Sequence, residues 1–240
     1  MIISGDNACL SCLLHNPSKA TEVLINKEKK ANYLKIIEKS NLNKITRYVD
    51  KKELQRIDRD NLRQSNDIII RRETYSPSSL AEIYNSNKEK SIIVVLDQLT
   101  DQNNLGNIIR TCLLMNVNGI ILPEHSSATI SGSTANTSAG AIEILKFHIS
   151  KNLNRSLEEL KKNGYWTYSL DMKGELICKN FKFDKKTIII VGSEGKGIRK
   201  NILTNSDFII SLPQDKIEGI DSYNAANSLA MTLFHHRLNI

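Results

Sequence analysis

Two polar loops in the last third of the chain carry the residues best suited to chemistry. The first is Gly192-Ser193-Glu194-Gly195-Lys196-Gly197, which follows an apolar run at 187–191. The second is Asp221-Ser222-Tyr223-Asn224, which comes after an apolar run at 208–213. Because loops beyond the carboxyl ends of strands form the ligand crevice of open α/β sheets, both loops are expected to line a binding site.

The glycine loop at 192–197 differs from two familiar phosphate sites. It lacks the G-x-x-x-x-G-K-[ST] order of a P-loop. It also follows a late strand, whereas the dinucleotide fingerprint opens the first strand–helix unit. The loop offers close approach of its backbone to a ligand and one carboxylate, Glu194. A nucleotide-binding α/β enzyme stays an alternative, and it predicts binding of ATP or GTP.

A third polar stretch begins directly after the apolar run at 91–96. That run is typical of a strand buried on both faces of a parallel sheet. Residues 97–112 then turn from a polar loop into an amphipathic helix, with Asn104 at its mouth and Arg110 six residues on. Arg110 is either a rim residue with its head in water or a group held inside a site, and the pattern leaves both open.

In this order and spacing, the three stretches resemble the signature motifs of the SpoU (TrmH-type) RNA ribose 2′-O-methyltransferases of the SPOUT class. The matching residues are Asn104-Leu105-Gly106 with Arg110, the loop at 192–197, and Ser222-Tyr223-Asn224 with Asn227. The resemblance covers residues 91–240. It implies a parallel sheet whose C-terminal segment forms a deep trefoil knot, and a homodimer with a site shared between subunits. It also implies S-adenosylmethionine as cofactor, S-adenosylhomocysteine as product and no metal.

The same resemblance assigns roles by position. Cofactor-binding positions are matched by Gly192, Gly197, Leu212 and Tyr223. The polar active-site set is matched by Asn104, Arg110, Glu194, Ser222 and Asn224. Arg110 matches the residue proposed to activate the ribose 2′-hydroxyl. Because the pKa of an arginine lies above 12, we expect Arg110 to orient the hydroxyl and a phosphate, and to accept the proton only if strongly perturbed.

The chain departs from the family pattern at a few positions. Tyr223 stands where the family has the leucine of a Ser-Leu-Asn triplet, which predicts a reshaped adenine-side pocket, and the preceding glycine is shifted to Gly219. The basic first domain is similar to the ribosomal-protein-like RNA-binding extension of the branch that methylates a guanosine of 23S ribosomal RNA. It lacks a His-Gln-Gly stretch, however, and has Arg63-Gln64-Ser65 instead. The alternatives are a tRNA 2′-O-methyltransferase and a non-catalytic RNA-binding factor in ribosome assembly.

Apolar runs alternate with helical patterns, which predicts an α/β fold with a mostly parallel sheet. We expect a small α/β RNA-binding domain at 1–74, a turn-rich linker at 75–90 and the methyltransferase domain at 91–240. Expected strands are 21–25, 44–49, 68–70, 91–96, 119–122, 144–149, 165–170, 187–191 and 208–213. Expected helices are 5–14, 28–40, 51–57, 80–84, the stretch around 105–114, 153–163 and the tail after 224.

Charge favours a polyanionic partner. The net charge is +7, and residues 1–90 hold 17 Lys and Arg against 12 Asp and Glu, while residues 91–240 hold 16 against 14. A basic domain beside a near-neutral one favours nucleic acid, although a lysine-rich surface without a partner has the same composition. Arginine suits phosphate by its forked donors, so we expect an RNA-facing role for Arg56, Arg59, Arg63, Arg71 and Arg72.

The remaining features favour a cytoplasmic protein. No apolar run approaches the roughly 18 residues of a membrane helix, and the first residues lack the basic segment of a signal peptide. Cys9 and Cys12 form a lone C-x-x-C that could be redox-active or half of a metal site. We instead expect Cys9, Cys12, Cys112 and Cys178 to be buried, reduced thiols. His235 and His236 are expected on the surface at the end of the last helix.

Overall fold

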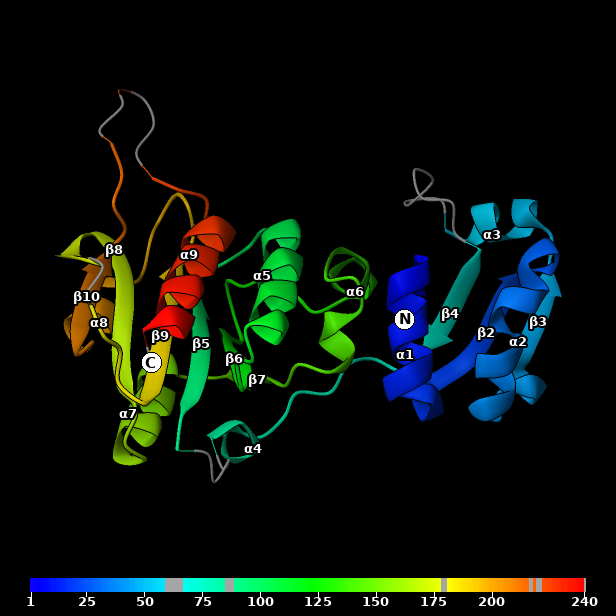
Figure 1. The fold of residues 1–240 in the computed structure, drawn as a ribbon, viewed down its shortest axis with the longest axis horizontal. Helices are drawn as coiled ribbons and strands as arrows, with labels where there is room; N and C mark the ends of the chain where they lie inside the picture. Colours follow the sequence, from blue (N-terminus) through cyan, green and yellow to red (C-terminus); the bar gives the residue numbers. More distant parts are fainter. Residues whose placement is uncertain (59–66, 85–88, 178–180, 216–217, 219–221, 240) are drawn as a thin grey trace. The chain divides into compact units, whose positions relative to one another are not determined.

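Figure 1 shows the protein as a computed structural model that describes residues 1–58, 67–84, 89–177, 181–215, 218 and 222–239. The chain divides into two compact units. The first comprises Met1–Ser76 with Thr129–Ile144, and the second comprises Pro77–Ala128 with Leu145–Ile240. Sequence patterns placed residues 129–144 in the second domain, whereas the structure groups them with the first 76 residues.

The first unit is built on a four-stranded sheet with the order β1-β4-β2-β3. Its strands are β1 (Ile2–Ser4), β2 (Ala20–Asn26), β3 (Thr46–Val49) and β4 (Ile68–Arg72). The helices α1 (Asp6–His15), α2 (Lys30–Lys39) and α3 (Lys51–Ile57) confirm the three expected there. Of these four strands, only β1 was not expected, because three residues are too few to show a period.

Residues 129–144 lie against the first unit through small side chains. They form α6 (Gly132–Thr137) and a 3-10 turn (Ala141–Glu143). A Cβ atom on Gly132 would lie 1.9 Å from the carbonyl oxygen of Ile2, and one on Gly140 would lie 2.4 Å from the Cβ of Ser11. Glycine is therefore required at both positions for the segment to pack this closely.

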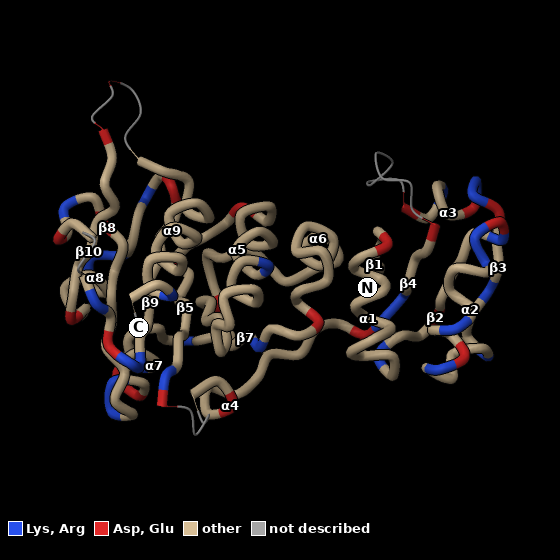
Figure 2. The backbone as a smooth tube through the Cα atoms, in the orientation of Figure 1, with Lys and Arg blue, Asp and Glu red and all other residues tan. Residues whose placement is uncertain are grey.

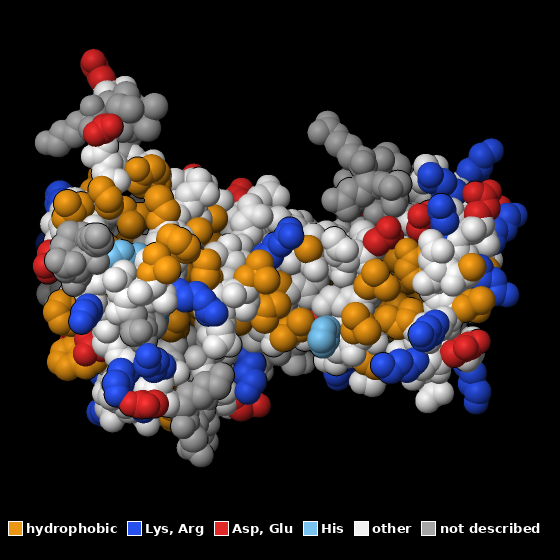
Figure 3. All heavy atoms as spheres, in the orientation of Figure 1, with side chains coloured by type: hydrophobic (Ala, Val, Ile, Leu, Met, Phe, Trp, Pro, Cys, Tyr) orange, Lys and Arg blue, Asp and Glu red, His pale blue; other side chains and the backbone are white. Residues whose placement is uncertain are grey.

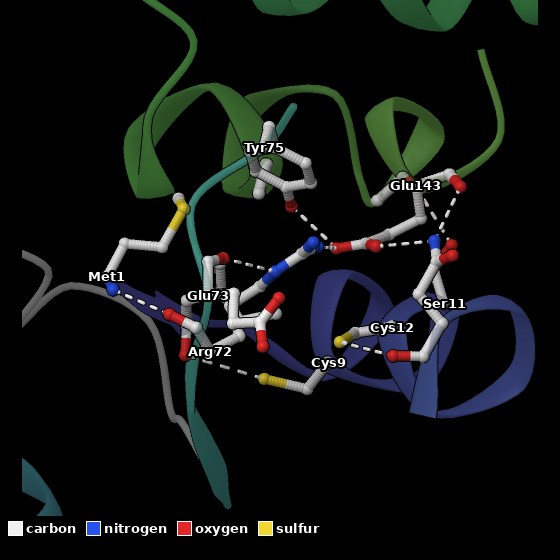
Figure 4. Close-up of polar contacts among 12 residues, drawn as sticks. Met1, Cys9, Ser11, Cys12, Arg72, Glu73, Tyr75 and Glu143 are labelled. Carbon is white, nitrogen blue, oxygen red and sulfur yellow. Dashed lines mark hydrogen bonds and ion pairs between the residues drawn. The ribbon is translucent and has the colours of Figure 1, made fainter. Parts of the chain in front are cut away.

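A buried polar group that we call the Glu143 cluster fastens this segment (Figure 4). It consists of Asn16, Arg72, Tyr75 and Glu143. Arg72 forms an ion pair with Oε1 of Glu143, and the Tyr75 hydroxyl donates a hydrogen bond of 2.5 Å to the same oxygen. Asn16 Nδ2 donates to Oε2 at 2.9 Å. The Arg72 guanidinium also lies over the Tyr75 ring, 3.9 Å from its centroid.

This cluster corrects one expectation about RNA. Arg72 is buried in the ion pair, so its expected RNA-facing role is wrong. Arg71 pairs with Glu22 on the surface. Arg56 is exposed, and Arg59 and Arg63 lie outside the described residues.

The cysteines of the first unit are confirmed as buried thiols. Cys9 and Cys12 are free and buried, as is Cys112 in the second unit, while Cys178 lies outside the described residues. Burial, with the nearby Glu143 charge, raises the pKa of Cys12 to about 12. Because the thiolate is the reactive form, this C-x-x-C is suited to packing.

The second unit contains a six-stranded sheet in which all paired neighbours are parallel, in the order β10-β8-β9-β5-β6-β7. The strands are β5 (Ser91–Asp97), β6 (Gly119–Pro123), β7 (Phe147–Ser150), β8 (Trp166–Leu176), β9 (Lys186–Gly192) and β10 (Phe208–Ser211). The helices are α4 (Leu80–Tyr84), α5 (Gln102–Leu114), α7 (Leu153–Lys162), α8 (Lys200–Thr204) and α9 (Ala225–Leu238). The expected α/β class and parallel sheet are confirmed.

Helices cover both faces of this sheet. Ile188 and Ile190 pack in one core cluster with residues of α4, α7 and α8, including Leu157. The intervening Ile189 and Val191 are also buried, and α9 contacts β9 and α5 (Figure 1). This burial on both faces explains why the strand sequences are almost continuously apolar.

Strand β8 is longer than expected and carries an irregularity. Ile209 of β10 pairs with Ser169, but the next residue, Ile210, pairs with Glu175. Residues 170–174 therefore bulge out of the ladder. A Cβ atom on Gly174 would lie 2.5 Å from the amide nitrogen of Ile210, which explains the glycine.

The prediction that both histidines of α9 lie on the surface is wrong for His236. This side chain is fully buried and packs on Phe183, with ring centroids 5.0 Å apart. Neither of its ring nitrogens has a hydrogen-bond partner among the described residues. Burial and the neighbouring His235 lower the pKa of His236 to about 4, so the ring is neutral at physiological pH.

Among the described helices, none is long and apolar enough to cross a bilayer.

Candidate active site

A pocket of about 370 Å³ opens at the carboxyl ends of β9 and β10, beside residues 170–172 of β8. The loop after β9 supplies one wall, β8 residues 170–172 a second, and β10 with the start of α9 the rest. Predicted site residues among its lining are Gly192, Glu194, Gly197, Leu212, Ser222 and Tyr223. The loops chosen from the sequence therefore meet at one cavity. The elbow residue Asp221 lies outside the described residues.

The glycine loop folds back on itself beside this pocket. A Cβ atom on Gly192 would lie 2.2 Å from the carbonyl carbon of Gly197, so no larger residue fits there. Gly197 has φ +65° and donates its amide to the Ser193 carbonyl at 2.8 Å. In contrast, nothing lies within 4 Å of a Cβ atom built on Gly195. The loop thus presents its backbone at the cavity.

An ion pair that sequence patterns did not reveal connects the end of β5 to the residue just beyond this loop. Asp97 ends β5 fully buried, with its backbone in register with Gly192. Its carboxylate accepts hydrogen bonds of 2.8 Å from the backbone N and from Nε of Arg199, just beyond the loop. The sequence does show an acidic residue at the end of an apolar run. It does not show the partner of this residue, which lies 102 positions further along the chain.

Three predicted polar residues join at the pocket rim in what we call the Glu194 cluster: Asn104, Glu194 and Asn224. Asn104 Nδ2 donates to Glu194 Oε1 at 2.9 Å, and Asn224 Nδ2 donates to Asn104 Oδ1 at 3.0 Å and also to Glu194 Oε1. Asn224 is also the N-cap of α9, where its Oδ1 accepts the Ala226 amide at 2.9 Å. The helix end thus fixes the orientation of the Asn224 amide.

The N-terminal ends of two helices therefore position the cluster. Asp101 caps α5 and accepts the Asn104 amide at 2.7 Å, which places Asn104 in the first turn. Glu194 is exposed, and among the described residues no cation pairs with it. A carboxylate held only by neutral amides keeps acceptor capacity for a ligand hydroxyl.

The structure does not bring Arg110 into the Glu194 cluster. Arg110 is exposed on α5, six residues beyond Asn104, and the described residues give it no hydrogen bond or ion pair. Of the two interpretations left open, the exposed position is the one observed within a single chain. Tyr223 lies at the pocket and donates its hydroxyl to the Pro213 carbonyl at 3.0 Å.

The protein has a parallel α/β sheet, a pocket at a glycine loop and a carboxylate that accepts hydrogen bonds from two amides. These features define a ligand-binding α/β protein. Comparison with known proteins identifies its family. Residues 91–234 match the family model described as the SpoU rRNA methylase family. An uncharacterized tRNA/rRNA methyltransferase of Borreliella burgdorferi is 34% identical over 165 residues, covering 69% of this chain and 71% of that protein. The chain therefore belongs to the SpoU rRNA methylase family of RNA methyltransferases.

Other relatives extend the likeness. TrmH family relatives from Staphylococcus aureus are 31% identical, and the match spans 65% of their length, just under two thirds. The SpoU methyltransferase AviRb from Streptomyces viridochromogenes, solved with AdoMet, shares the fold over 99% of this chain and 89% of its own, with a TM-score of 0.80 and 18% identity. An AdoMet-bound rRNA methyltransferase from Sinorhizobium meliloti gives a TM-score of 0.77 at 20% identity, over 99% and 86% of the two chains.

Proposed function

We propose that this protein transfers a methyl group from S-adenosylmethionine to a ribose 2′-hydroxyl of structured RNA, with a guanosine of 23S ribosomal RNA as the target. One observation carries the proposal: Glu194 both lines the pocket and belongs to the cluster with Asn104 and Asn224. A ligand in the pocket and a hydroxyl at the cluster would therefore meet. Membership of the SpoU family supports methyl transfer as the reaction.

The pocket suits the cofactor. Its volume of about 370 Å³ falls in the range of small-molecule sites, and its walls combine apolar side chains with exposed backbone. Gly192, Gly197, Leu212 and Tyr223 would hold S-adenosylmethionine there, with the glycines giving the backbone access to the ligand. When bound, the cofactor supplies a methyl group on a sulfonium, an electrophile that reacts without a metal.

The protein's own residues then position the nucleophile. A ribose hydroxyl is a weak nucleophile, so it must be held in line and must lose its proton as it attacks. Glu194 and the two asparagines would orient the hydroxyl, with Ser222 beside them at the pocket. Arg110 would bind the hydroxyl and an RNA phosphate through its forked donors.

A homodimer would explain why Arg110 stands apart from the cluster of its own chain. Helix α9 exposes Met231, Phe234 and Leu238, which recur at helical spacing, and hydrophobic side chains gather over it in Figure 3. Leu114 at the end of the adjacent α5 is 72% exposed. An exposed apolar stripe of this kind fits a second copy, and Arg110 would then reach the site of that copy.

We also propose that the C-terminal segment forms the trefoil knot that the resemblance implies.

The first unit would bind the RNA. Lys and Arg are prominent on β3, α2 and α3 in Figure 2. Exposed lysines there without a carboxylate partner among the described residues include Lys35, Lys39, Lys51 and Lys52. Cations that are not neutralised by carboxylates are the ones available to phosphates.

Methyl transfer decides the proposal. Labelled S-adenosylmethionine would be offered with protein-free large-subunit ribosomal RNA and, in parallel, bulk tRNA, and the product mapped by resistance to alkaline cleavage. Label at one alkali-resistant guanosine of the ribosomal RNA is expected. Label in tRNA alone would contradict the target, and no label with either RNA would contradict catalysis on free RNA and favour an assembly factor or a ribosomal particle as substrate.

An Arg110→Ala variant tests the role given to Arg110. It should lose at least about 10²-fold in turnover, in the range of positioned proton-transfer groups, and should keep its affinity for S-adenosylhomocysteine because Arg110 lies outside the pocket lining. Near wild-type turnover would contradict the assignment.

A further inference from the structure

Two walls of the pocket carry opposite charges that the Glu194 cluster does not use. Asp171 comes from the bulge in β8, and Lys196 comes from the glycine loop. Among the described residues that line the pocket, Glu194 is the one other charged residue, and Asn104 and Asn224 already donate to it. Asp171 and Lys196 are therefore the charged groups of the described lining that no other side chain engages.

Asp171 is held in place but unpaired. Its Oδ1 accepts the backbone amide of Lys173 at 2.9 Å, which fixes the carboxylate within the bulge. No Lys, Arg or His among the described residues forms an ion pair with Asp171. Ile209 pairs with Ser169 while Ile210 pairs with Glu175, so an irregularity of the ladder places Asp171 at the cavity.

Lys196 is equally unpaired on its own wall. Its backbone amide donates to the Ser193 hydroxyl at 3.3 Å, which helps to shape the loop. Within the described part of the chain, no carboxylate lies within ion-pair distance of its ammonium group, Asp171 included. Apart from Glu194, which two asparagine amides hold, the described lining has one anion and one cation without ion-pair partners on different walls, and such a pair is complementary to a zwitterion.

We propose that these residues bind the amino-acid end of the cofactor, Asp171 holding the α-ammonium group and Lys196 the α-carboxylate. The inference rests on the proposed function, since that end belongs to S-adenosylmethionine and its product alike. An ammonium group donates three hydrogen bonds and a carboxylate accepts them, so each charge finds its complement. The rest of the pocket, including the apolar side chain of Leu212, is left for the nucleoside.

Binding to the full-length protein without RNA tests the proposal. Titration calorimetry would compare S-adenosylhomocysteine, which carries the zwitterion, with 5′-methylthioadenosine, which has the same nucleoside but no amino-acid end. Asp171→Asn keeps the hydrogen bond to the Lys173 amide and removes only the charge. Its control is Glu175→Gln, which removes an exposed carboxylate of the same strand that does not line the pocket.

The expected result is selective. Asp171→Asn should weaken the binding of S-adenosylhomocysteine about 10-fold or more, as for loss of a hydrogen bond to a charged group. The same variant should bind methylthioadenosine with unchanged affinity. Lys196→Met should weaken the binding of S-adenosylhomocysteine about 3-fold, because Lys196 is an exposed point charge on a flexible stem. Glu175→Gln should change neither ligand. Asp171→Ser serves as a second variant, and melting curves confirm that each variant is folded.

Three outcomes would overturn the proposal. Unchanged affinity of Asp171→Asn and Asp171→Ser for S-adenosylhomocysteine would remove Asp171 from the site. Equal weakening of both ligands would place Asp171 at the nucleoside instead. Failure of the wild-type protein to bind S-adenosylhomocysteine at all would contradict the proposed function itself, which the other two outcomes leave intact.

Discussion

Each unit of the molecule contains a glutamate whose carboxylate accepts a hydrogen bond from asparagine. The two glutamates differ in their burial and in their other partners. Glu143 of the first unit is 8% exposed, and both of its carboxylate oxygens are occupied, one by Arg72 and Tyr75 and the other by Asn16. Glu194 of the second unit is exposed, and amide groups alone donate to it within the described chain.

The difference shows how one residue type serves structure in one place and chemistry in another. A buried carboxylate must be fully satisfied, because an unpaired charge in the interior is costly. Once it is satisfied, it has nothing left to offer a ligand. An exposed carboxylate beside a pocket can keep acceptor capacity, because water satisfies it until a ligand arrives. The Glu143 cluster therefore stabilises the packing of residues 129–144 in the first unit, and the Glu194 cluster is the candidate active site.

The largest expected effect is on the Glu143 cluster. Glu143→Ala should lower the free energy of unfolding of the first unit by about 3–5 kcal/mol, because it leaves the Arg72 charge buried without its partner. Urea denaturation followed by circular dichroism measures this. The matched control is Glu38→Ala, an exposed glutamate of α2, which should stay within about 0.5 kcal/mol. A loss below about 1 kcal/mol at Glu143 would contradict the fastening role.

Asn224 of the second unit both caps α9 and donates to the Glu194 cluster, and a substitution can separate these two roles. Asp is as good an N-cap as Asn, so Asn224→Asp should leave the free energy of unfolding nearly unchanged. It replaces the amide donor by a second carboxylate facing Glu194, and methyl transfer should fall about 10²-fold. Comparing thermal melts with initial rates tests this. A stable variant with the wild-type rate would remove Asn224 from the chemistry.

His236 tests the rule that buried polar groups are satisfied. Its pKa is about 4 in the folded protein, against an ordinary value of about 6.5. The unfolded chain therefore takes up the proton first as the pH falls, and stability present above pH 6.5 is lost between about 6.5 and 4. Moving from pH 7 to 5 should cost about 2 kcal/mol through this residue.

The measurement for His236 is the difference in unfolding free energy between pH 7 and 5 for wild type and His236→Phe. The variant lacks the titrating group, so its pH dependence should be shallower by that amount. It should also be no less stable at pH 7, since removing an unpaired buried polar group is neutral or favourable. Identical pH dependence of both proteins would show that His236 does not carry the effect.

The smallest expected effect is at Asp97, where a buried carboxylate supports the site without belonging to it. Asp97→Asn keeps the shape and weakens the bonds to Arg199, whose side chain is 38% exposed. The expected loss is about 1.5 kcal/mol in unfolding free energy, the low end for hydrogen bonds to charged groups. Methyl transfer at saturating cofactor should change less than in Asn224→Asp. A larger loss of rate than of stability would assign Asp97 to the site.

Much of the second unit could be predicted from the sequence because buried parallel strands are continuous apolar runs. The runs at 91–96 and 187–191 are observed as β5 and β9. Asn104 in the first turn of α5, Glu194 in the loop after β9 and Asn224 at the cap of α9 lie within hydrogen-bond distance of one another. Motif spacing was sufficient here because short loops at strand ends meet at one sheet edge.

Other features depend on contacts that no local pattern records. Residues 129–144 are small and polar, without a period, so nothing in them indicated that they complete the first unit. Asp97 and Arg199 are 102 positions apart. His236 follows another histidine near the end of α9, a polar pattern that favours the surface, and only the aromatic residues packed on it explain its burial.

The most direct test of the central contrast is the rate of methyl transfer by Glu194→Gln at saturating RNA and S-adenosylmethionine. The substitution keeps the size of the side chain and removes its charge at an exposed position. We predict a fall of about 10²-fold or more, with a free energy of unfolding within about 0.5 kcal/mol of wild type. A folded variant that transfers methyl at the wild-type rate would show that the Glu194 cluster is not the active site.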